Sequence, residues 1–289
     1  MGSSEGVRVA VVGSANLDVV VTVERFPAPG ETVLGGELVE IAGGKGLNQA
    51  VAAARRAPSA LVGCVGDDDA GRLLLSTMQR TGVVTDHVRH VGTPTGRAFI
   101  QVSGSGENSI VVAPAANAEL TVDQVAGALD ELGPVVVLCQ LEVPVASVLA
   151  AAEWASASGA RFVLNPSPVQ DLPDSLVELC DPLVVNAGEA AHLLGAEGGA
   201  DVADLTAGLA GRSRSVVVTD GPRGAHVGSS SGIVAVPGVP AEAVDTTGAG
   251  DEFAGCLAAA VAGGESLVAA AEAANRAAAR VVGLPRAER

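Results

Sequence analysis

The sequence is poor in aromatic residues and in positive charge. Only 2% of its 289 residues are aromatic, and 17 lysines and arginines stand against 33 aspartates and glutamates, a formal net charge of −16 at pH 7. Nucleic acids and anionic membranes attract basic surfaces. We therefore expect neither as a partner, whereas small-molecule ligands remain open.

It also lacks the features of a secreted, disulfide-bonded or membrane protein. Its four cysteines lie far apart without a C-x-x-C pair, so neither a zinc knuckle nor a disulfide framework is indicated. The first residues contain no apolar core of signal-peptide length, and no later run of about 18 uncharged apolar residues occurs. We expect a cytoplasmic protein.

Short β-branched runs alternate with alanine-rich segments along most of the chain. Residues 7–13 (VRVAVVG) are typical of a buried strand that enters a turn, and residues 135–141 precede the alanine-rich stretch 147–159. This alternation implies βαβ units, and hence a mostly parallel sheet with helices on both faces. The sequence predicts an α/β fold: one Rossmann-like layered domain over residues 1–289 with a mostly parallel central sheet.

Two stretches, at about 18–40 and 95–113, break this rhythm. Apolar and polar residues alternate there around the turns PAPGE and SGSGE. Such a pattern favours exposed antiparallel strands. We expect these strands to form a small inserted β-sheet that acts as a lid on the main domain.

The segment Asp245-Thr246-Thr247-Gly248-Ala249-Gly250-Asp251 opens an apolar helix. A glycine-containing turn at a helix start leaves the first amides pointing outward at the positive end of the dipole, where a phosphate can bind. The carboxylate of Asp251 would lie beside that phosphate and could accept a proton from an attacking hydroxyl. The alternative makes Thr246 and Asp251 simple helix caps.

A second glycine-rich segment, Gly43-Gly44-Lys45-Gly46, also leads into a helix and is followed by Asn48. Glycines let a ligand approach the backbone closely, and an asparagine can both donate to and accept from sugar hydroxyls. The spacing is not that of a Walker A loop. Taken alone, the segment is as compatible with an ordinary loop as with a binding site.

Polar residues also follow three predicted strands. Asn16 and Asp18 come after the first strand, Glu142 ends an apolar run, and Asn186 and Glu189 follow another. Ligands of open parallel sheets gather outside the carboxyl ends of the strands. Each of these residues could instead be a cap or a solvated turn residue.

Together these segments resemble the ribokinase-like (PfkB) family of carbohydrate kinases. The resemblance covers roughly residues 9–280, with the segments in the family's order and spacing. The two signature regions, G-G-K-G-x-N and D-T-T-G-A-G-D, are both present. The matching blocks are GSANLD, GGKGLNQA, GCVGDDDAG, TGRAFIQVSGSGENSIVVAPAAN, QLEVP, NPSP, NAGEAAHLLG, VVVTDGPRGA and VDTTGAGD.

The resemblance implies a kinase that transfers the γ-phosphate of ATP to the primary hydroxyl of a sugar. Asp251 would be the catalytic base, and Gly248, Ala249 and Gly250 would supply amides for the charge on the phosphate. Glu142 in Q-L-E is similar to the family members that phosphorylate the 5-hydroxyl of D-ribose. The residues expected to contact the sugar are Asn16, Asp18, Gly43, Gly44, Lys45, Asn48, Glu142 and Asp251.

The same resemblance implies a nucleotide site with magnesium. Glu189, with Asn186, would organise Mg²⁺ and the nucleotide phosphates. The other residues expected along ATP are Thr219, Gly221, Gly224 and Asn275, the last near the adenine.

The resemblance also implies a monovalent-cation site and a homodimer. Asp245 and Thr247 match a site usually occupied by K⁺, but the sequence VVGLPRAER lacks the glycine- and serine-containing loop that normally completes it. Lids of such proteins often pair, and an exposed sheet with one apolar face favours a homodimer through the lid.

Glu252 departs from the family, which usually has threonine, serine or alanine after the base. Adjacent helical residues point about 100° apart, so Glu252 is expected to face away from Asp251; facing the phosphates, it would repel ATP. The alternatives left open are a kinase for another sugar, a sugar acid or a nucleoside, and a non-catalytic sugar- or nucleotide-binding regulator. Scarce aromatics weaken the nucleoside option, and the absence of G-x-G-x-x-G after the first strand argues against an NAD(P)-dependent oxidoreductase.

Overall fold

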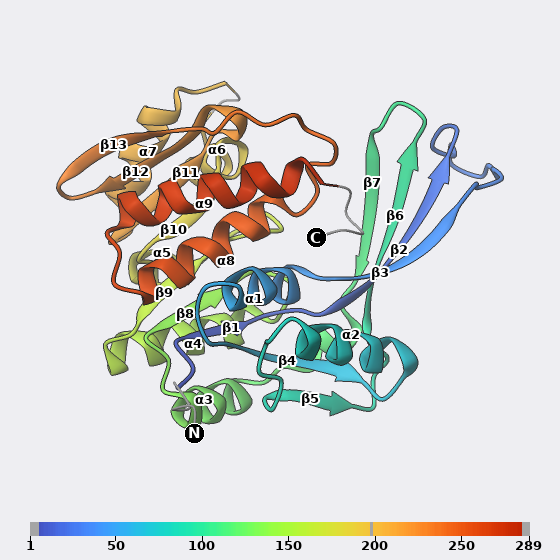
Figure 1. Cartoon of the computed structure of the whole chain (residues 1–289), viewed down its shortest axis with the longest axis horizontal. Coiled ribbons are helices and arrows are strands. Elements are labelled where there is room, and N and C mark those ends of the chain that lie inside the picture. The colour runs from blue at the N-terminus through green and yellow to red at the C-terminus, as the bar shows by residue number, and fades with distance from the viewer. Residues whose placement is uncertain (1–5, 197–198, 285–289) are drawn as a thin grey trace.

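The computed structural model describes residues 6–196 and 199–284, and its fold is mixed α/β (Figure 1). In this part of the chain nine strands form a large sheet in the order β13-β12-β11-β10-β9-β8-β1-β4-β5. Neighbours from β5 to β11 run parallel, whereas β12 and β13 add an antiparallel edge. The mostly parallel central sheet is confirmed. Its strands are β1 (Val9–Val12), β4 (Ser59–Gly66), β5 (Val88–Val91), β8 (Val136–Cys139), β9 (Arg161–Leu164), β10 (Leu183–Asn186), β11 (Ser215–Thr219), β12 (Gly224–Ser229) and β13 (Gly232–Pro237).

Strand β1 shows why this sheet is buried on both faces. Its four residues are all buried, and successive side chains enter different cores: Val9 and Val11 pack on one face, Ala10 and Val12 on the other. Strands of parallel sheets that are covered on both faces typically have continuous apolar sequences of this kind.

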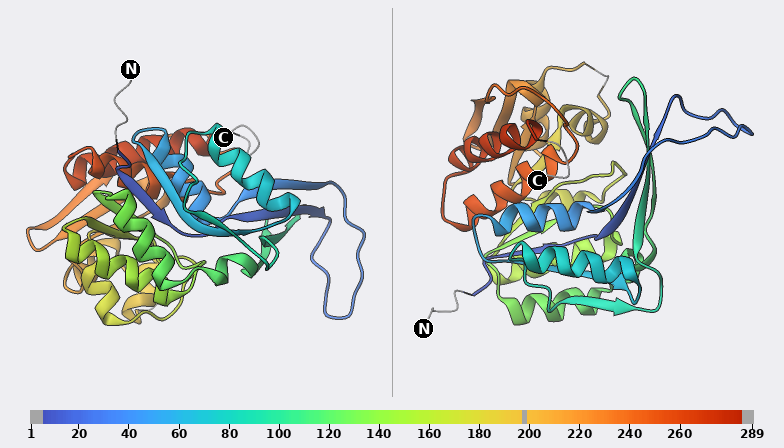
Figure 2. Two further views of the ribbon diagram at one scale, coloured as in Figure 1. Left: turned by 90° about the horizontal axis from the view of Figure 1, so that it is seen from below. Right: turned by 45° about the vertical axis from the view of Figure 1, so that its right-hand side comes forward.

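Helices form a layer on each face of the large sheet, as Figure 2 shows. Among the residues described, no helix is long and apolar enough to cross a membrane. One layer contains α1 (Lys45–Ala54), α2 (Asp69–Arg80), α8 (Ala249–Ala262) and α9 (Leu267–Val282). The other contains α3 (Val122–Leu132), α4 (Val145–Ser158), α5 (Asp174–Leu179), α6 (Ala187–Leu194) and α7 (Val202–Ala210), and 3₁₀ turns span Ala115–Glu119 and Gly221–Arg223.

A second sheet projects from the main body, at the right of Figure 1. Its strands lie in the order β3-β2-β6-β7. The two outer pairs are antiparallel, as predicted. The central pair, β2 with β6, was not predicted and runs parallel from Asn16 opposite Gly96 to Val23 opposite Ser103. Both strands leave the large sheet on the same side and run outward together. The bounds are β2 (Asn16–Val23), β3 (Leu38–Gly43), β6 (Gly96–Ser103) and β7 (Asn108–Ala113).

Candidate active site

The predicted site residues gather at the carboxyl edge of the large sheet. Strand order reverses at β1, which lies between β8 and β4, and such a switch point opens a crevice outside the strand ends. Polar residues follow each central strand at this edge. They are Ser14 and Asn16 after β1, Gln140 and Glu142 after β8, Asn165 after β9, Asn186 at the end of β10 and Thr219 at the end of β11.

The glycines of the G-G-K-G segment let α1 begin directly against the β1–β2 turn. A Cβ atom on Gly46 would lie 2.4 Å from the Ser14 amide nitrogen, and one on Gly44, whose φ is 90°, would lie 2.7 Å from that of Asn16. A Cβ atom on Gly43 would lie 2.3 Å from a carboxylate oxygen of Asp18. These glycines therefore bring the start of α1 and the Asp18 carboxylate together.

Glu142 is held by three donors at one oxygen. Its Oε2 accepts from Ser14 Oγ at 2.6 Å, Asn16 Nδ2 at 3.2 Å and the Lys45 amide at 3.1 Å. Burial raises the pKa of this carboxyl, and the hydrogen bonds from Ser14 and Lys45 oppose that rise. Ser14 was missed by the sequence analysis, because a serine in a turn has no distinctive spacing.

Asn16 is buried against Glu142 and lines neither of the two cavities described below. It is 1% exposed, and its Oδ1 accepts from Asn117 Nδ2 at 2.7 Å. The Asn117 Oδ1 accepts in turn from the Ala15 amide at 3.0 Å. Because a backbone amide can only donate, this chain fixes the Asn16 carboxamide with its nitrogen toward Glu142.

Asp251 lies in the first turn of α8 and is held by two amides from α1. Its Oδ2 accepts from Asn48 Nδ2 at 3.0 Å, and its Oδ1 accepts from Gln49 Nε2 at 2.9 Å. The helices approach closely because Gly255 has no side chain: a Cβ atom there would lie 2.3 Å from the Gln49 carbonyl oxygen. Gln49 was not among the predicted site residues.

The start of α8 presents uncapped amides. Gly248 is the N-cap with φ 77° and no side chain caps the helix, so Thr246 and Asp251 are not caps. The first helical hydrogen bond runs from the Glu252 amide to the Gly248 carbonyl at 2.9 Å, which leaves the Gly250 and Asp251 amides outside the ladder. The Ala249 amide donates to the Thr246 carbonyl at 3.2 Å. A Cβ atom on Gly250 would meet nothing within 4 Å. The positive helix end therefore faces open space, as an anion site requires.

A cavity of about 180 Å³ lies beside Asp251. It brings together many predicted residues and also Asn165 and Ser167, which belong to the NPSP block but had no predicted role. Gly221, Gly224, Asn275 and Asp245 do not line it. The lining residues are Lys45, Asn165, Ser167, Val184, Val185, Asn186, Glu189, Thr219, Gly248, Gly250, Asp251 and Phe253.

Asn186 and Glu189 form a reciprocal capping box at the start of α6. Asn186 Oδ1 accepts from the Glu189 amide at 2.8 Å, and Glu189 Oε2 accepts from the Asn186 amide at 2.9 Å. Burial raises the pKa of Glu189, and the negative charge of Asp251 adds to the rise. The cap interpretation is thus correct, and the same two residues line the cavity.

Two predicted nucleotide residues have structural roles away from the cavity. Gly224 begins β12 with φ 107°, and a Cβ atom there would lie 2.2 Å from the Val236 carbonyl oxygen. Asn275 is buried, and its Nδ2 donates to the Pro237 carbonyl at 3.1 Å, which ties α9 to the end of β13.

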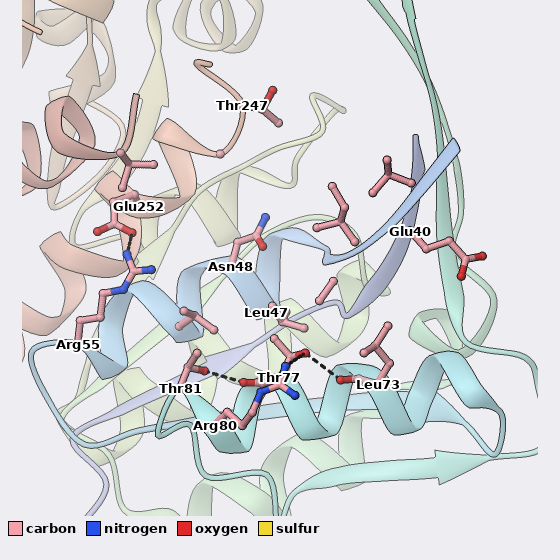
Figure 3. Close-up of a pocket in the computed structure, with 16 residues that line it drawn as sticks. Glu40, Leu47, Asn48, Arg55, Leu73, Thr77, Arg80, Thr81, Thr247 and Glu252 are labelled. Carbon is pink, nitrogen blue, oxygen red and sulfur yellow. Dashed lines mark hydrogen bonds and ion pairs between the residues drawn. The ribbon is translucent and has the colours of Figure 1, made fainter. Parts of the chain in front are cut away.

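A larger cavity, of about 520 Å³, lies between β3, α1, α2 and the start of α8 (Figure 3). Asn48, Thr247 and Gly248 line it, and Gly248 lines the smaller cavity as well. Glu252 also points to this side, and Figure 3 shows it paired with Arg55.

Glu252 faces away from the Asp251 partners and is neutralised. It is 7% exposed, its Oε2 lies 2.5 Å from Arg55 Nη1, and its Oε1 lies 3.3 Å from Arg280 Nη2. The expectation that it turns away from Asp251 agrees with this geometry. Glu252 therefore joins α1, α8 and α9 instead of adding unpaired charge beside the anion site.

Comparisons with known proteins cover nearly the whole chain. Residues 7–288 match the family described as pfkB family carbohydrate kinase. The chain is 37% identical over 273 residues to the ribokinase of Bacillus subtilis, covering 93% of this chain and 91% of that one. It is 39% identical over 255 residues to the ribokinase of Haemophilus influenzae, covering 85% and 82%. The structure of Arabidopsis thaliana ribokinase complexed with ribose and ATP matches with a TM-score of 0.86 at 30% identity, covering 96% and 93%.

Proposed function

The chain belongs to the pfkB family of carbohydrate kinases, and on that premise we propose that it transfers the γ-phosphate of ATP to the 5-hydroxyl of D-ribose. Relatives at 37% and 39% identity are ribokinases, and a similar structure holds ribose and ATP. The observation that carries the proposal is the Asp251 carboxylate beside the uncapped amides of α8.

In this mechanism Asp251 acts as the base. The 5-hydroxyl oxygen attacks the γ-phosphorus, the bond from that phosphorus to the bridging oxygen of ADP breaks, and the hydroxyl proton passes to the Asp251 carboxylate. The turn formed by Gly248, Ala249 and Gly250 would stabilise the negative charge that develops on the phosphoryl oxygens. The Gly250 amide is outside the helical ladder, whereas the Ala249 amide would first have to leave the Thr246 carbonyl. Asn48 and Gln49 hold the carboxylate in place.

The sugar is bound at the start of α1. Among the described residues Glu142 Oε1 has no hydrogen-bond donor, so it can accept from a sugar hydroxyl while Oε2 is held by the protein. Asp18, Lys45 and Asn48 supply further polar groups, and Gly43 and Gly44 leave room at the backbone. Asn16 orients Glu142.

The nucleotide phosphates lie in the smaller cavity, which has Thr219 and Asn186 on its wall. Gly221 follows Thr219 by two residues in the chain. No three metal-binding side chains converge in residues 6–196 and 199–284. Mg²⁺ is commonly held by one or two carboxylates together with phosphate oxygens and waters, and Glu189, on the cavity wall, fits that pattern. Bound Mg²⁺ would neutralise charge on the phosphates.

The proposal includes K⁺ at the turn before α8. The Thr247 amide donates to Asp245 Oδ1 at 2.8 Å, which orients the Asp245 carboxylate within this turn. Carboxylate oxygens are hard ligands suited to such a cation. The end of the sequence, which lacks the loop that normally completes such a site, falls partly outside the described residues. Replacing K⁺ by Na⁺ in the assay tests this part, and equal rates would remove it.

The proposal also includes a homodimer through the projecting sheet. Val19, Phe99 and Val111 are paired across β2, β6 and β7, so they share one face. Phe99 is 48% exposed and Val111 66%, and an exposed apolar sheet face favours pairing with a second copy. Sedimentation of Val111→Asp should show monomers where the wild type shows dimers; a monomeric wild type contradicts the dimer.

The activity is tested by measuring ADP formation from Mg-ATP with D-ribose, deoxyribose, fructose, a ketodeoxy acid and adenosine. Turnover selective for ribose is the expected result. Turnover selective for another compound would replace ribose as the substrate. Stabilisation against heat by a sugar without any turnover would indicate a binding regulator instead.

A further inference from the structure

Gln49 lines neither of the two cavities described above, yet it contacts the carboxylate of the proposed base. We propose that Gln49 is a positioning residue: its carboxamide fixes the orientation of the Asp251 carboxylate through a chain of amides that is anchored on a backbone carbonyl. The inference rests on the proposed role of Asp251 as the base. It concerns a residue that touches the base and not the substrate.

The amide chain consists of Asn165, Gln49 and Gln140, and it is closely packed. Gln49 is fully buried at 0% exposure. Its Nε2 donates to Asp251 Oδ1 at 2.9 Å and to Asn165 Oδ1 at 3.0 Å, and its Oε1 accepts from Gln140 Nε2 at 2.7 Å. Both amide hydrogens and the carbonyl oxygen of Gln49 are therefore used.

The direction of every hydrogen bond in the chain follows from its anchor. Asn165 Nδ2 donates to the Val184 carbonyl at 3.0 Å, and a carbonyl can only accept. Asn165 must therefore present its oxygen to Gln49, so Gln49 must present its nitrogen to Asn165 and to Asp251. The Gln49 oxygen then faces Gln140, whose own nitrogen is the group that satisfies it.

Gln140, at the far end of the amide chain, shows that this arrangement has a cost in free energy. Gln140 Oε1 is buried and has no hydrogen-bond partner in the part of the chain that is described. It also lies where a Cβ atom on Gly13 would come within 2.1 Å, so only glycine leaves room for it. A buried polar atom without a partner is unfavourable, and such atoms are rare in folded proteins. The cost is explained if the chain serves to present a donor to Asp251.

Gln49 and Asn48 differ in how firmly they can hold the base. Asn48 is only half-buried and lines the larger cavity, whereas Gln49 is enclosed and tied at three points. Asn48 can thus exchange its contact with Asp251 for a sugar hydroxyl, while Gln49 keeps the carboxylate plane fixed. Loss of Gln49 should therefore lower kcat and leave the KM values for ribose and ATP largely unchanged.

The test compares Gln49→Met, Gln49→Glu and Gln140→Met in steady-state ribose phosphorylation. Gln49→Met should lower kcat by roughly 100-fold, the effect of a misplaced catalytic group, with both KM values within about twofold. Gln140→Met removes the donor to Gln49 Oε1 together with the unpartnered oxygen, but it leaves the contacts of Gln49 with Asp251 and Asn165, so its kcat should fall clearly less than that of Gln49→Met.

Gln49→Glu keeps the side-chain size, so it can test whether Gln49 positions Asp251 even if Gln49→Met does not fold. The introduced carboxyl group would repel Asp251 when it is ionised, but it can donate a hydrogen bond to Asp251 when it is protonated. The kcat of this variant relative to wild type should therefore rise as the pH falls, whereas a structural role predicts no such recovery.

Three outcomes would overturn the inference: unchanged kcat in Gln49→Met, equal losses in Gln49→Met and Gln140→Met, or a pH-independent loss in Gln49→Glu. A wild type without ribose-dependent turnover would instead overturn the proposed function, so the two failures are distinguishable.

Discussion

Asp251 and Glu252 are adjacent carboxylates on α8, yet they lie in opposite environments. Neutral amides from α1 hold Asp251, and no ion pair involving it occurs among the described residues. Glu252 is clamped between Arg55 and Arg280. One turn of helix therefore has a side suited to chemistry and a side that attaches the helix to its neighbours.

The difference teaches how a fold separates a reactive acid from a structural one. Amide donors orient a carboxylate without cancelling its charge, so it remains able to accept a proton. Arginine partners neutralise the charge and restrict the carboxylate in a stable contact. The rotation of about 100° between successive helical residues is enough to place the two acids on different sides.

The largest effect is expected from a variant that fills the open space beside Asp251 at the start of α8. Gly250→Ala places a methyl group where nothing in the protein lies within 4 Å, so the fold should tolerate it while phosphate is excluded. We expect kcat/KM for ATP to fall by roughly 100-fold or more, with unfolding stability equal to wild type or slightly higher. Gly127→Ala, at a helical glycine of α3 with equally open surroundings, is the control and should leave activity unchanged. A fully active Gly250→Ala would mean that no phosphate binds there.

A second variant extends the comparison to Glu142, which neutral donors also hold. Its pKa is raised by burial, so protonation begins at a higher pH than the ordinary value of 4.5. If the ionised form accepts from the sugar, the KM for ribose should rise as the pH falls through that raised pKa. Glu142→Gln should show a KM higher by roughly tenfold that no longer depends on pH in this range. A wild-type KM that is flat down to pH 4.5 would contradict this role.

Replacing Glu252 should have a smaller effect, which concerns the stability of the fold and not the rate of the reaction. Glu252→Gln loses the charge between two arginines, and because both arginines are partly exposed they can turn to solvent. The free energy of unfolding should fall by about 1–2 kcal/mol, with kcat within about threefold of wild type. Urea unfolding measures it.

The matched control for that variant is Glu265→Gln. Glu265 pairs with Arg56 at 3.1 Å near the far ends of α1 and α8, but both side chains are about 40% exposed. An exposed pair contributes roughly 0–1 kcal/mol, so its loss should be barely detectable. Equal losses in the two variants would show that burial of Glu252 does not matter.

The layered fold and the strand-end positions of the site were predictable because they follow from local patterns. Apolar runs such as Val9–Val12 and the glycine turn before Asp251 indicate strands and a helix start within a few residues. The parallel pairing of β2 with β6 was not predictable, because alternating residues look the same in a parallel and an antiparallel pair.

The hydrogen-bond and ion-pair partners of Asp251 and Glu252 could also not be predicted from the sequence. Gln49 lies in an alanine-rich helix and meets Asp251, 202 residues away, only because α1 packs against Gly255. Arg55 reaches Glu252 across 197 residues in the same way. Neutral amide side chains do not form a sequence motif of the kind that metal ligands or catalytic residues form, so no local pattern identified Gln49 or Gln140.

The most direct test of the account is the rate of ribose-dependent ADP formation by wild type, Asp251→Asn and Glu252→Gln under identical conditions. We expect turnover by the wild type, a loss of roughly 10²- to 10⁴-fold in Asp251→Asn with ribose binding retained, and a nearly unchanged rate in Glu252→Gln. Comparable rates for Asp251→Asn and wild type would contradict it, because the proton would then have another acceptor.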